Sequence, residues 1–330
     1  MNCIEALLFV TSFNDQPSCS QLGGDFSVRA VQSAPKVGVY QRISLSQSRL
    51  SFGYKSGSLV LRTAMNTVQS AGANSYMGID GESYVWQVQL SELSVYQYGV
   101  RFSGGLNEDL WVKSQNESWG LRELAWGAAE RNQWMSRADV GFSILKSGEW
   151  FNAALRISNG EGMRARERNN GKNIEGLLGI YKEGARLEIF ARDASLGVSS
   201  FRNHRIGLRG SYKTDGFRFG TEYLKTYGIP YAPKRDPWLI SNWGILELNI
   251  PLSIVARFDW LQEEASVYET NIWTALGYRL EPRAHVWIGF EHQKASEQWV
   301  SFSGAQALTQ SHHIFVQLTG HLNTSFNTKP

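Results

Sequence analysis

The chain has 330 residues, a net charge of +3 and a mean hydropathy of −0.31, values that many soluble proteins share. No run of about 18 apolar residues is present, which excludes a membrane protein built from spanning helices. The small net charge gives no reason to expect a nucleic acid as partner. Aromatic residues reach 12%, however, and 32 glycines accompany only 8 prolines. This mixture suits many twisted strands that carry aromatic rings at an interface.

The N-terminal segment, residues 1–24, is expected to lie outside the folded domain. It holds both cysteines of the chain, Cys3 and Cys19, so a metal or redox role for cysteine in the remaining residues is ruled out. Residues 6–13 form a short apolar stretch, but residues 1–5 lack the Lys or Arg of an ordinary signal peptide. We interpret the segment as a truncated or unusual signal, with an ordinary N-terminal extension as the alternative.

Sixteen segments are predicted as strands. Five lie in the first third, near 25–32, 37–54, 58–66, 83–92 and 95–103. Eleven follow, near 138–146, 149–158, 173–181, 184–193, 202–213, 216–226, 241–250, 253–263, 269–280, 283–294 and 311–322. From Ala138 onward polar and apolar residues alternate with period 2, and the segments have about the ten residues that a tilted strand needs to cross a bilayer.

The connections between these strands alternate in length. Tight turns are expected at 55–57, 146–148, 182–184, 213–216, 250–252 and 281–283, several with the Gly or Pro that such turns need. Longer connections are expected at 159–172, 194–201, 227–240, 264–268 and 295–310. An up-and-down barrel with short periplasmic turns and long extracellular loops produces this alternation, and an even strand number leaves both termini on the periplasmic side.

The longest connection, residues 104–137, carries four tryptophans, Trp111, Trp119, Trp126 and Trp134. Two interpretations stay open for it. The segment either folds into the barrel and narrows it, or forms an external flap or an extended strand above the membrane.

The two faces of the strands indicate which side meets lipid. In 184–193, Leu187 and Ile189 share one face while Arg186 and Glu188 share the other. Sixteen strands enclose a lumen too wide for side chains to fill, so the apolar face must point outward. The predicted fold class is therefore all-β, a transmembrane antiparallel up-and-down β-barrel over residues 25–322, followed by a C-terminal tail over 323–330.

Three short motifs suggest a family. They are Ser136–Gly141 at the start of a strand, Asn159–Gly162 at the outer end of the next hairpin, and Ala256–Trp260. In this order and spacing, over roughly 90–322, the chain resembles the Gram-negative porins related to the phosphate-selective porins O and P. The resemblance implies an outer-membrane channel for passive diffusion of small hydrophilic solutes, often a homotrimer. Phosphate selectivity is not carried over, because its ladder of lysines and arginines has no residue-by-residue match here.

Charged residues on the polar face are the candidate site. The predicted pore-lining residues are Arg101, Arg156, Arg186, Arg205, Arg209, Arg218, Arg257 and Asp259. Three further arginines and four acids share this face: Arg62, Arg192, Arg279, Glu175, Glu188, Glu222 and Glu291. Ten arginines against five acids predict a mild preference for anions. The alternative is that the charges pair across strands and only keep the lumen wet.

Two other classes of function stay open. An outer-membrane barrel enzyme would need a base–carboxylate constellation, for which only His292, His312 and His313 with Glu291 and Glu297 qualify. A hydrated barrel rim explains these residues more simply, so no catalytic residue, metal or cofactor is predicted. A soluble all-β binding protein would extract without detergent. Outer-membrane lipid and lipopolysaccharide are the expected surroundings. The four cations of the loop 160–172 suit anions or lipopolysaccharide phosphates, with a solvated charged loop as the alternative.

Overall fold

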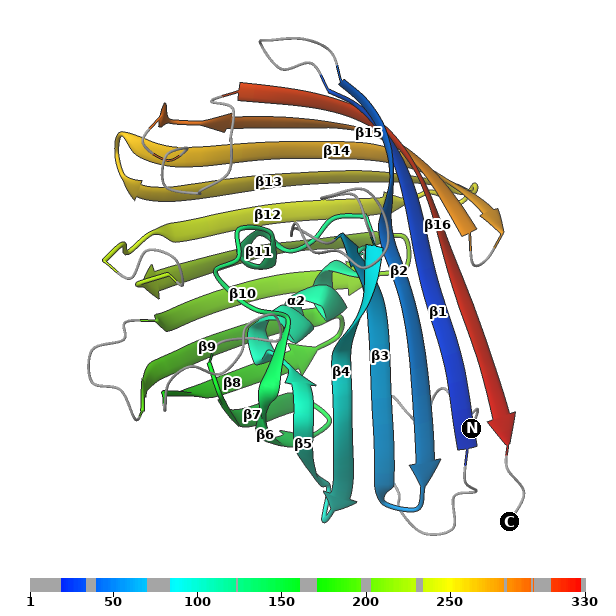
Figure 1. The fold of residues 1–330 in the computed structure, drawn as a ribbon, viewed down its shortest axis with the longest axis vertical. Coiled ribbons are helices and arrows are strands. Elements are labelled where there is room, and N and C mark those ends of the chain that lie inside the picture. The colour runs from blue at the N-terminus through cyan, green and yellow to red at the C-terminus, as the bar shows by residue number, and fades with distance from the viewer. Residues whose placement is uncertain are drawn as a thin grey trace.

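A computed structural model describes residues 19–33, 40–69, 84–122, 124–160, 171–196, 203–229, 234–281, 284–297, 299 and 310–327. Sixteen antiparallel strands in these ranges close into a barrel (Figure 1), which confirms the predicted fold class. Each strand pairs with its neighbours along the chain, and β1 pairs with β16 to close the ring. Among the described residues, no helix has both the length and the apolar character to span a membrane.

The strands lie near the expected segments; each overlaps one of them, except β4, which overlaps both 83–92 and 95–103. In chain order they are β1 (Cys19–Ser33), β2 (Tyr40–Ser56), β3 (Leu59–Gln69), β4 (Tyr84–Gln97), β5 (Val100–Glu108), β6 (Ala138–Ser147), β7 (Phe151–Ser158), β8 (Lys172–Lys182), β9 (Ala185–Leu196), β10 (His204–Thr214), β11 (Phe217–Tyr227), β12 (Trp238–Glu247), β13 (Leu252–Glu264), β14 (Val267–Glu281), β15 (Ala284–Ala295) and β16 (Gln310–Asn327).

Both ends of the barrel extend beyond the predicted boundaries. β1 begins at Cys19, inside the expected segment 1–24, and β16 continues to Asn327, inside the expected tail 323–330. β1 pairs over its whole length with residues 313–327 of β16, and the two strands lie side by side (Figure 1). Backbone hydrogen bonds that close a barrel need no apolar alternation, so the sequence carries no signal for these extensions. The interpretation of residues 1–18 as a signal concerns residues outside the described ranges.

The turns confirm the alternation of short and long connections, with two corrections. β4 runs past the expected boundary, and its turn is Tyr98–Gly99 rather than 93–94. Both turn residues have positive φ, 50° and 70°, as a two-residue type I′ hairpin requires. The connection expected at 264–268 shrinks to two residues between β13 and β14, because both strands continue beyond the apolar pattern. The expected turn residues Pro282 and Arg283 lie outside the described residues.

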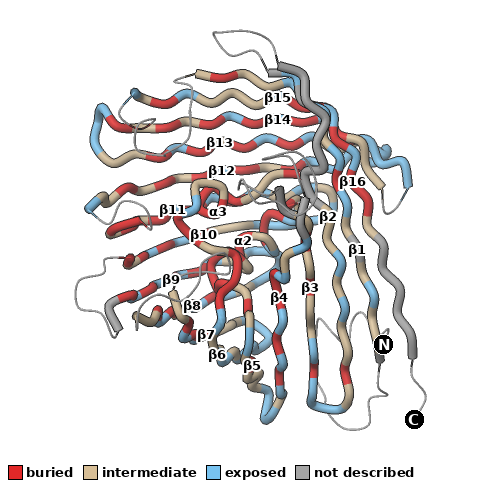
Figure 2. Tube along the Cα trace, in the orientation of Figure 1, coloured by how far each residue is buried: buried red, intermediate tan, exposed pale blue. Residues whose placement is uncertain are grey.

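The outer face of the barrel is apolar. Along β13, Ile254 and Trp260 are exposed while Arg257 and Asp259 are buried, and Figure 2 shows the same alternation of exposed and buried positions along many strands. Aromatic rings meet on this face toward both strand ends, as in the pair Trp238–Trp260 with centroids 5.4 Å apart. An apolar band with aromatic edges is the exterior that a lipid bilayer requires.

The segment between β5 and β6 folds into the barrel, which decides between the two interpretations of the tryptophan-rich connection. It forms α2 (Leu110–Trp119) and α3 (Ala128–Arg131). Figure 1 shows α2 inside the ring of strands, where it packs against β8 and β11 while α3 packs against β12. We call residues 109–137 the inner loop.

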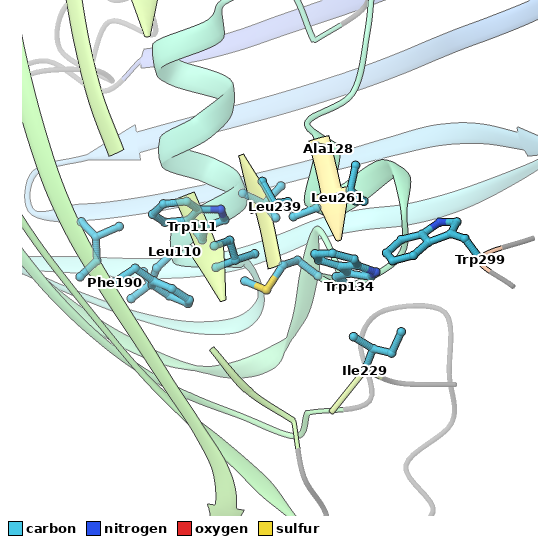
Figure 3. Close-up of a cluster of buried hydrophobic side chains, with 14 of the residues drawn as sticks. Leu110, Trp111, Ala128, Trp134, Phe190, Ile229, Leu239, Leu261 and Trp299 are labelled. Atoms are coloured by element: carbon cyan, nitrogen blue, oxygen red, sulfur yellow. The ribbon is translucent and has the colours of Figure 1, made fainter. Parts of the chain in front are cut away.

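An apolar core lies between the inner loop and the barrel wall (Figure 3). Trp111 packs on Phe190 of β9 with ring centroids 5.5 Å apart. Farther along the inner loop, Trp134 packs on Trp299 with ring centroids 6.2 Å apart. The inward positions of β9–β13 therefore include apolar side chains that the loop covers, and this part of the lumen is filled with protein.

Candidate functional site: the constricted lumen

The inner loop starts at a fixed point on the wall. Asp109 caps α2, because its carboxylate accepts hydrogen bonds from the backbone N–H groups of Trp111 at 2.9 Å and Val112 at 3.1 Å. Its own N–H donates to the carbonyl of Arg137 at 2.8 Å. The first and last residues of the loop are thus joined, and the segment between them projects into the lumen as one unit.

Wall arginines hold the loop at each of its four tryptophans. In every case a guanidinium N–H donates to a tryptophan backbone carbonyl, at distances between 2.7 and 3.2 Å. The four pairs are Arg209 with Trp111, Arg218 with Trp119, Arg257 with Trp126, and Arg205 with Trp134. Four residues that sequence analysis assigns to the pore lining are therefore contacts of the loop with β10, β11 and β13.

A buried ionic network surrounds the first of these contacts. Arg209 pairs with Glu188 at 3.2 Å and Glu222 at 3.1 Å, and all three side chains are fully buried. Ser114 of α2 donates to Glu188 and accepts from Arg209 at 2.6 Å. The guanidinium carbon also lies 3.8 Å from the centre of the Trp111 ring. Arg186 also pairs with Glu188, at 2.6 Å, so two guanidinium groups stand against two carboxylates and the group contributes little net field to the lumen.

A second buried network lies at the start of α2. Arg156 pairs with Glu175 at 2.7 Å, and Arg192 pairs with both Glu175 and Asp109. Arg156 donates further to the side chain of Asn107 at 2.7 Å. The carboxylate and guanidinium groups neutralise one another and fill one another's hydrogen-bonding positions. Together they attach the loop to β7, β8 and β9.

The predicted site residues therefore separate into two groups, although all eight occupy inward-facing positions. Arg156, Arg205, Arg209, Arg257 and Asp259 are buried against the inner loop. Arg101, Arg186 and Arg218 keep side-chain exposures of 11%, 14% and 20%. Arg101 borders the open pocket, whereas Arg186 and Arg218 also bond Ser114 and Trp119 of the inner loop.

A group of charges that sequence analysis largely missed faces the open side of the loop; we call it the basic cluster. Its members come from β2 to β5 and from the inner loop: Arg49, Arg62, Arg101, Lys113, Arg137, Glu92 and Glu108. Arg62 and Arg101 share Glu92, with 2.7 Å from Arg62 to the carboxylate. Glu108 lies 3.8 Å from Arg62 and 3.7 Å from Arg137. Five cations thus stand against two carboxylates within the cluster, while Asp25, Glu117 and Glu130 at its edge offset part of this charge.

The basic cluster borders an open pocket lined by Arg62, Glu92, Arg101, Glu108 and Lys113 among others. Lys113 forms no ion pair within 4 Å among the described residues. Burial lowers its pKa from the ordinary value; the nearby Arg101 lowers the pKa further, whereas Glu117 raises it. The cluster therefore retains positive potential that an anion in the pocket would neutralise. Two features of the sequence point to this cluster. Arg62 and Arg101 lie at inward-facing positions of their strands, and the loop carries Lys113.

The histidines considered for an enzyme site are split by the barrel wall. Glu291 and His313 are cross-strand partners on the inner face, where Glu291 also meets Arg29 at 3.3 Å. His292 and His312 occupy the alternate positions, which face outward. His292 and His312 therefore cannot act with Glu291, and the full constellation that sequence analysis considered does not form; of its members, His313 and Glu291 share the inner face.

Comparison with solved structures identifies the fold. The anion-selective porin from Comamonas acidovorans superposes with a TM-score of 0.69 at 11% identity, covering 92% of this chain and 100% of that chain. OmpF of Salmonella typhi, in complex with daunomycin, superposes with a TM-score of 0.70 at 12% identity, covering 92% of this chain and 97% of that chain. OmpT, an outer membrane protein of Vibrio cholerae, superposes with a TM-score of 0.63 at 11% identity, covering 94% of this chain and 99% of that chain. No family model and no curated protein matches the sequence.

These likenesses show a sixteen-stranded barrel of the porin type. The narrower resemblance to the porins O and P is not confirmed by them. The closed barrel and its lipid-facing exterior assign the protein to the outer membrane of a Gram-negative bacterium.

Proposed function

We propose that this protein is a porin, a water-filled channel for passive diffusion of small hydrophilic solutes. The observation that carries the proposal is the inner loop, which lies within a closed sixteen-stranded barrel and is fixed to one side of the wall. Its attachment fills the lumen beside β9–β13 and leaves the pocket beside β4–β7 open. A constricted aqueous path lined by charge restricts solutes by size and sign.

The first experiment is conductance of the purified protein in planar bilayers. A porin gives stepwise increases in current that scale with salt concentration and need no added energy source. A barrel that inserts, shown by its resistance to protease, but carries no current would disprove the channel.

We propose further that the channel prefers anions mildly, as a consequence of the basic cluster. Five fixed cations against two carboxylates raise the local concentration of anions, and salt weakens this effect because the Debye length is about 10 Å at 0.1 M and about 3 Å at 1 M. The solved anion-selective porin of similar fold supports the same direction. Reversal potentials across a salt gradient measure it, and a cation-selective wild-type channel would overturn it.

We also propose a homotrimer, as the sequence resemblance to porins O and P implies. One neighbour of similar fold, OmpT of Vibrio cholerae, is described in a trimer form. Mass measurement of the detergent-solubilised protein by light scattering, before and after heating, tests the assembly. A single barrel before heating would contradict it.

A further inference from the structure

Two histidines face each other on the outer surface of the barrel, near the long-loop ends of β15 and β16. His292 and His312 are direct cross-strand partners, and their Nδ1 atoms lie 3.0 Å apart. The ring centroids are 4.5 Å apart and the ring planes are inclined by 23°. Because the nitrogens are closer than the ring centres, the two rings turn their Nδ1 atoms toward each other.

The pair lies at the upper border of the lipid-facing band. Phe290 and Ile314, each two residues away on the same face, are exposed apolar side chains. Phe290 also stacks on His312 with centroids 6.1 Å apart. On the opposite side the amide of Gln310 lies 3.3 Å from Nε2 of His312. Both histidines are half-buried, so the pair is ordered by its neighbours and still accessible to water.

Nothing of opposite charge explains this arrangement. The nearest carboxylate in sequence, Glu291, points to the inner face, where it meets His313. Within the described ranges, no third His, Cys, Asp or Glu joins the two rings. The site therefore offers two imidazole nitrogens and open positions toward water.

The separation of the two nitrogens fits bonds to one metal ion. Imidazole binds divalent transition metals at about 2.0–2.1 Å. Two bonds of that length to nitrogens 3.0 Å apart meet at an angle of about 94°. This is close to the right angle between adjacent ligands in a square-planar or octahedral complex, the geometries of Cu²⁺ and Ni²⁺.

We propose that His292 and His312 form a two-histidine binding site for a divalent transition-metal ion, with water in the remaining positions. Cu²⁺ binds most tightly, because affinities of nitrogen sites rise from Mn²⁺ to Cu²⁺ and fall again at Zn²⁺. The bound ion links β15 to β16, next to the pairing of β16 with β1 that closes the barrel. Without metal, one imidazole donates its Nδ1–H to the other.

The test uses the full chain without a histidine tag, folded in detergent and titrated with Cu²⁺ while its electron paramagnetic resonance spectrum is recorded. We expect one Cu²⁺ per chain with splitting from two nitrogens. His292→Gln and His312→Gln should each weaken binding at least tenfold. His313→Gln, one residue away but on the inner face, is the matched control and should bind as the wild type does.

Bilayer conductance equal to that of the wild type shows that each variant is folded. The proposal is wrong if the wild type binds no Cu²⁺ saturably, or if the double variant His292→Gln with His312→Gln still binds one ion. It is also wrong if the histidine variants change only the retention of lipopolysaccharide, since the pair would then be a contact for phosphate headgroups.

Discussion

At the scale of single residues, the depth and face of a side chain decide what it can tolerate. Ile189 and Ala185 both point outward from β9, but Ala185 adjoins the turn at 183–184 while Ile189 lies farther along the strand. Ile189 is 57% exposed and faces the acyl chains. A charged side chain at Ile189 would therefore lie among the acyl chains, whereas one at Ala185 would lie near the membrane surface.

We expect Ile189→Arg to destabilise the membrane-embedded barrel by about 2–4 kcal/mol, and Ala185→Arg by only about 0–1 kcal/mol, because the cost of arginine falls toward the interface. Urea titration of protein folded into lipid vesicles measures both. Equal losses at the two positions would show that this face of β9 does not meet a bilayer.

Asp109 gives a pH dependence whose sign follows from its surroundings. Burial, together with the nearby Glu175, raises its pKa to about 6, against the pull of Arg192 and Arg156. Between about pH 4 and 6 the folded protein then holds a proton that the unfolded chain has lost. Stability from this group falls as pH rises through that window.

Asp109→Asn should remove this contribution while keeping the cap of α2, because asparagine is an equally good N-cap residue. The urea midpoint of the wild type should fall more steeply than that of the variant between pH 4 and 6. Parallel pH profiles for the two proteins would mean that Asp109 ionises normally.

At the scale of elements, the inner loop is an α-helical segment held by the sheet around it. Its helix α2 is short and only weakly amphipathic, so its stability comes from the wall. Gly207 of β10 leaves room for this contact, since a Cβ there would approach the Trp111 ring within 2.9 Å. Arg218 then bonds the carbonyl of Trp119, the last residue of α2, where a helix leaves its carbonyls without intrahelical partners.

We expect Arg209→Ala to destabilise the barrel by about 3–5 kcal/mol, because Glu188 and Glu222 are left buried with less compensating charge. The released start of α2 should also add current noise and substates to single-channel records. Arg279→Ala, at an exposed inward position near the turns, is the control and should change stability by less than about 0.5 kcal/mol. Quiet wild-type currents in Arg209→Ala would exclude a role for this arginine in holding the loop.

The basic cluster is the element that should set ion preference. Lys113 has no carboxylate within 4 Å among the described residues, so Lys113→Gln removes an unpaired cation from the cluster. The anion-to-cation permeability ratio should therefore fall, by up to about fivefold if the charge contributes about 1 kcal/mol. Lys182→Gln, at the short-turn end of β8, should leave the ratio unchanged. A ratio that responds equally to both variants would place selectivity outside the cluster.

At the scale of the whole molecule, the sorting of connections predicts the orientation in the membrane. The start of β1, the end of β16 and the tight turns lie at one end of the barrel, and the longer connections lie mostly at the other (Figure 1). In an outer membrane the short turns face the periplasm.

A protease site inserted after Ser147 should therefore be protected on intact cells, while one inserted after Lys234 should be cleaved. Both should be cleaved after the cells are opened. Cleavage of only the Ser147 insertion on intact cells would invert this topology.

Much of this architecture could be predicted from the sequence, because its causes are local. Strand alternation depends only on whether each side chain meets lipid or the interior, so residues such as Leu155 and Arg156 reveal their faces without any structure. Turn residues such as Glu183 and Gly184, both with positive φ, mark the hairpin by their own backbone preferences.

Only the tertiary structure decided which inward charges meet water. Arg209 and Arg101 look alike in the sequence, since both alternate inward on a strand, yet one is fully buried under α2 and the other borders the open pocket. The difference arises because the inner loop docks on β8–β13, far from its own position in the chain. The sequence by itself determined the barrel, its lipid face and its sorted loops, because these follow from neighbouring residues; the constriction and its basic cluster depend on packing between distant segments.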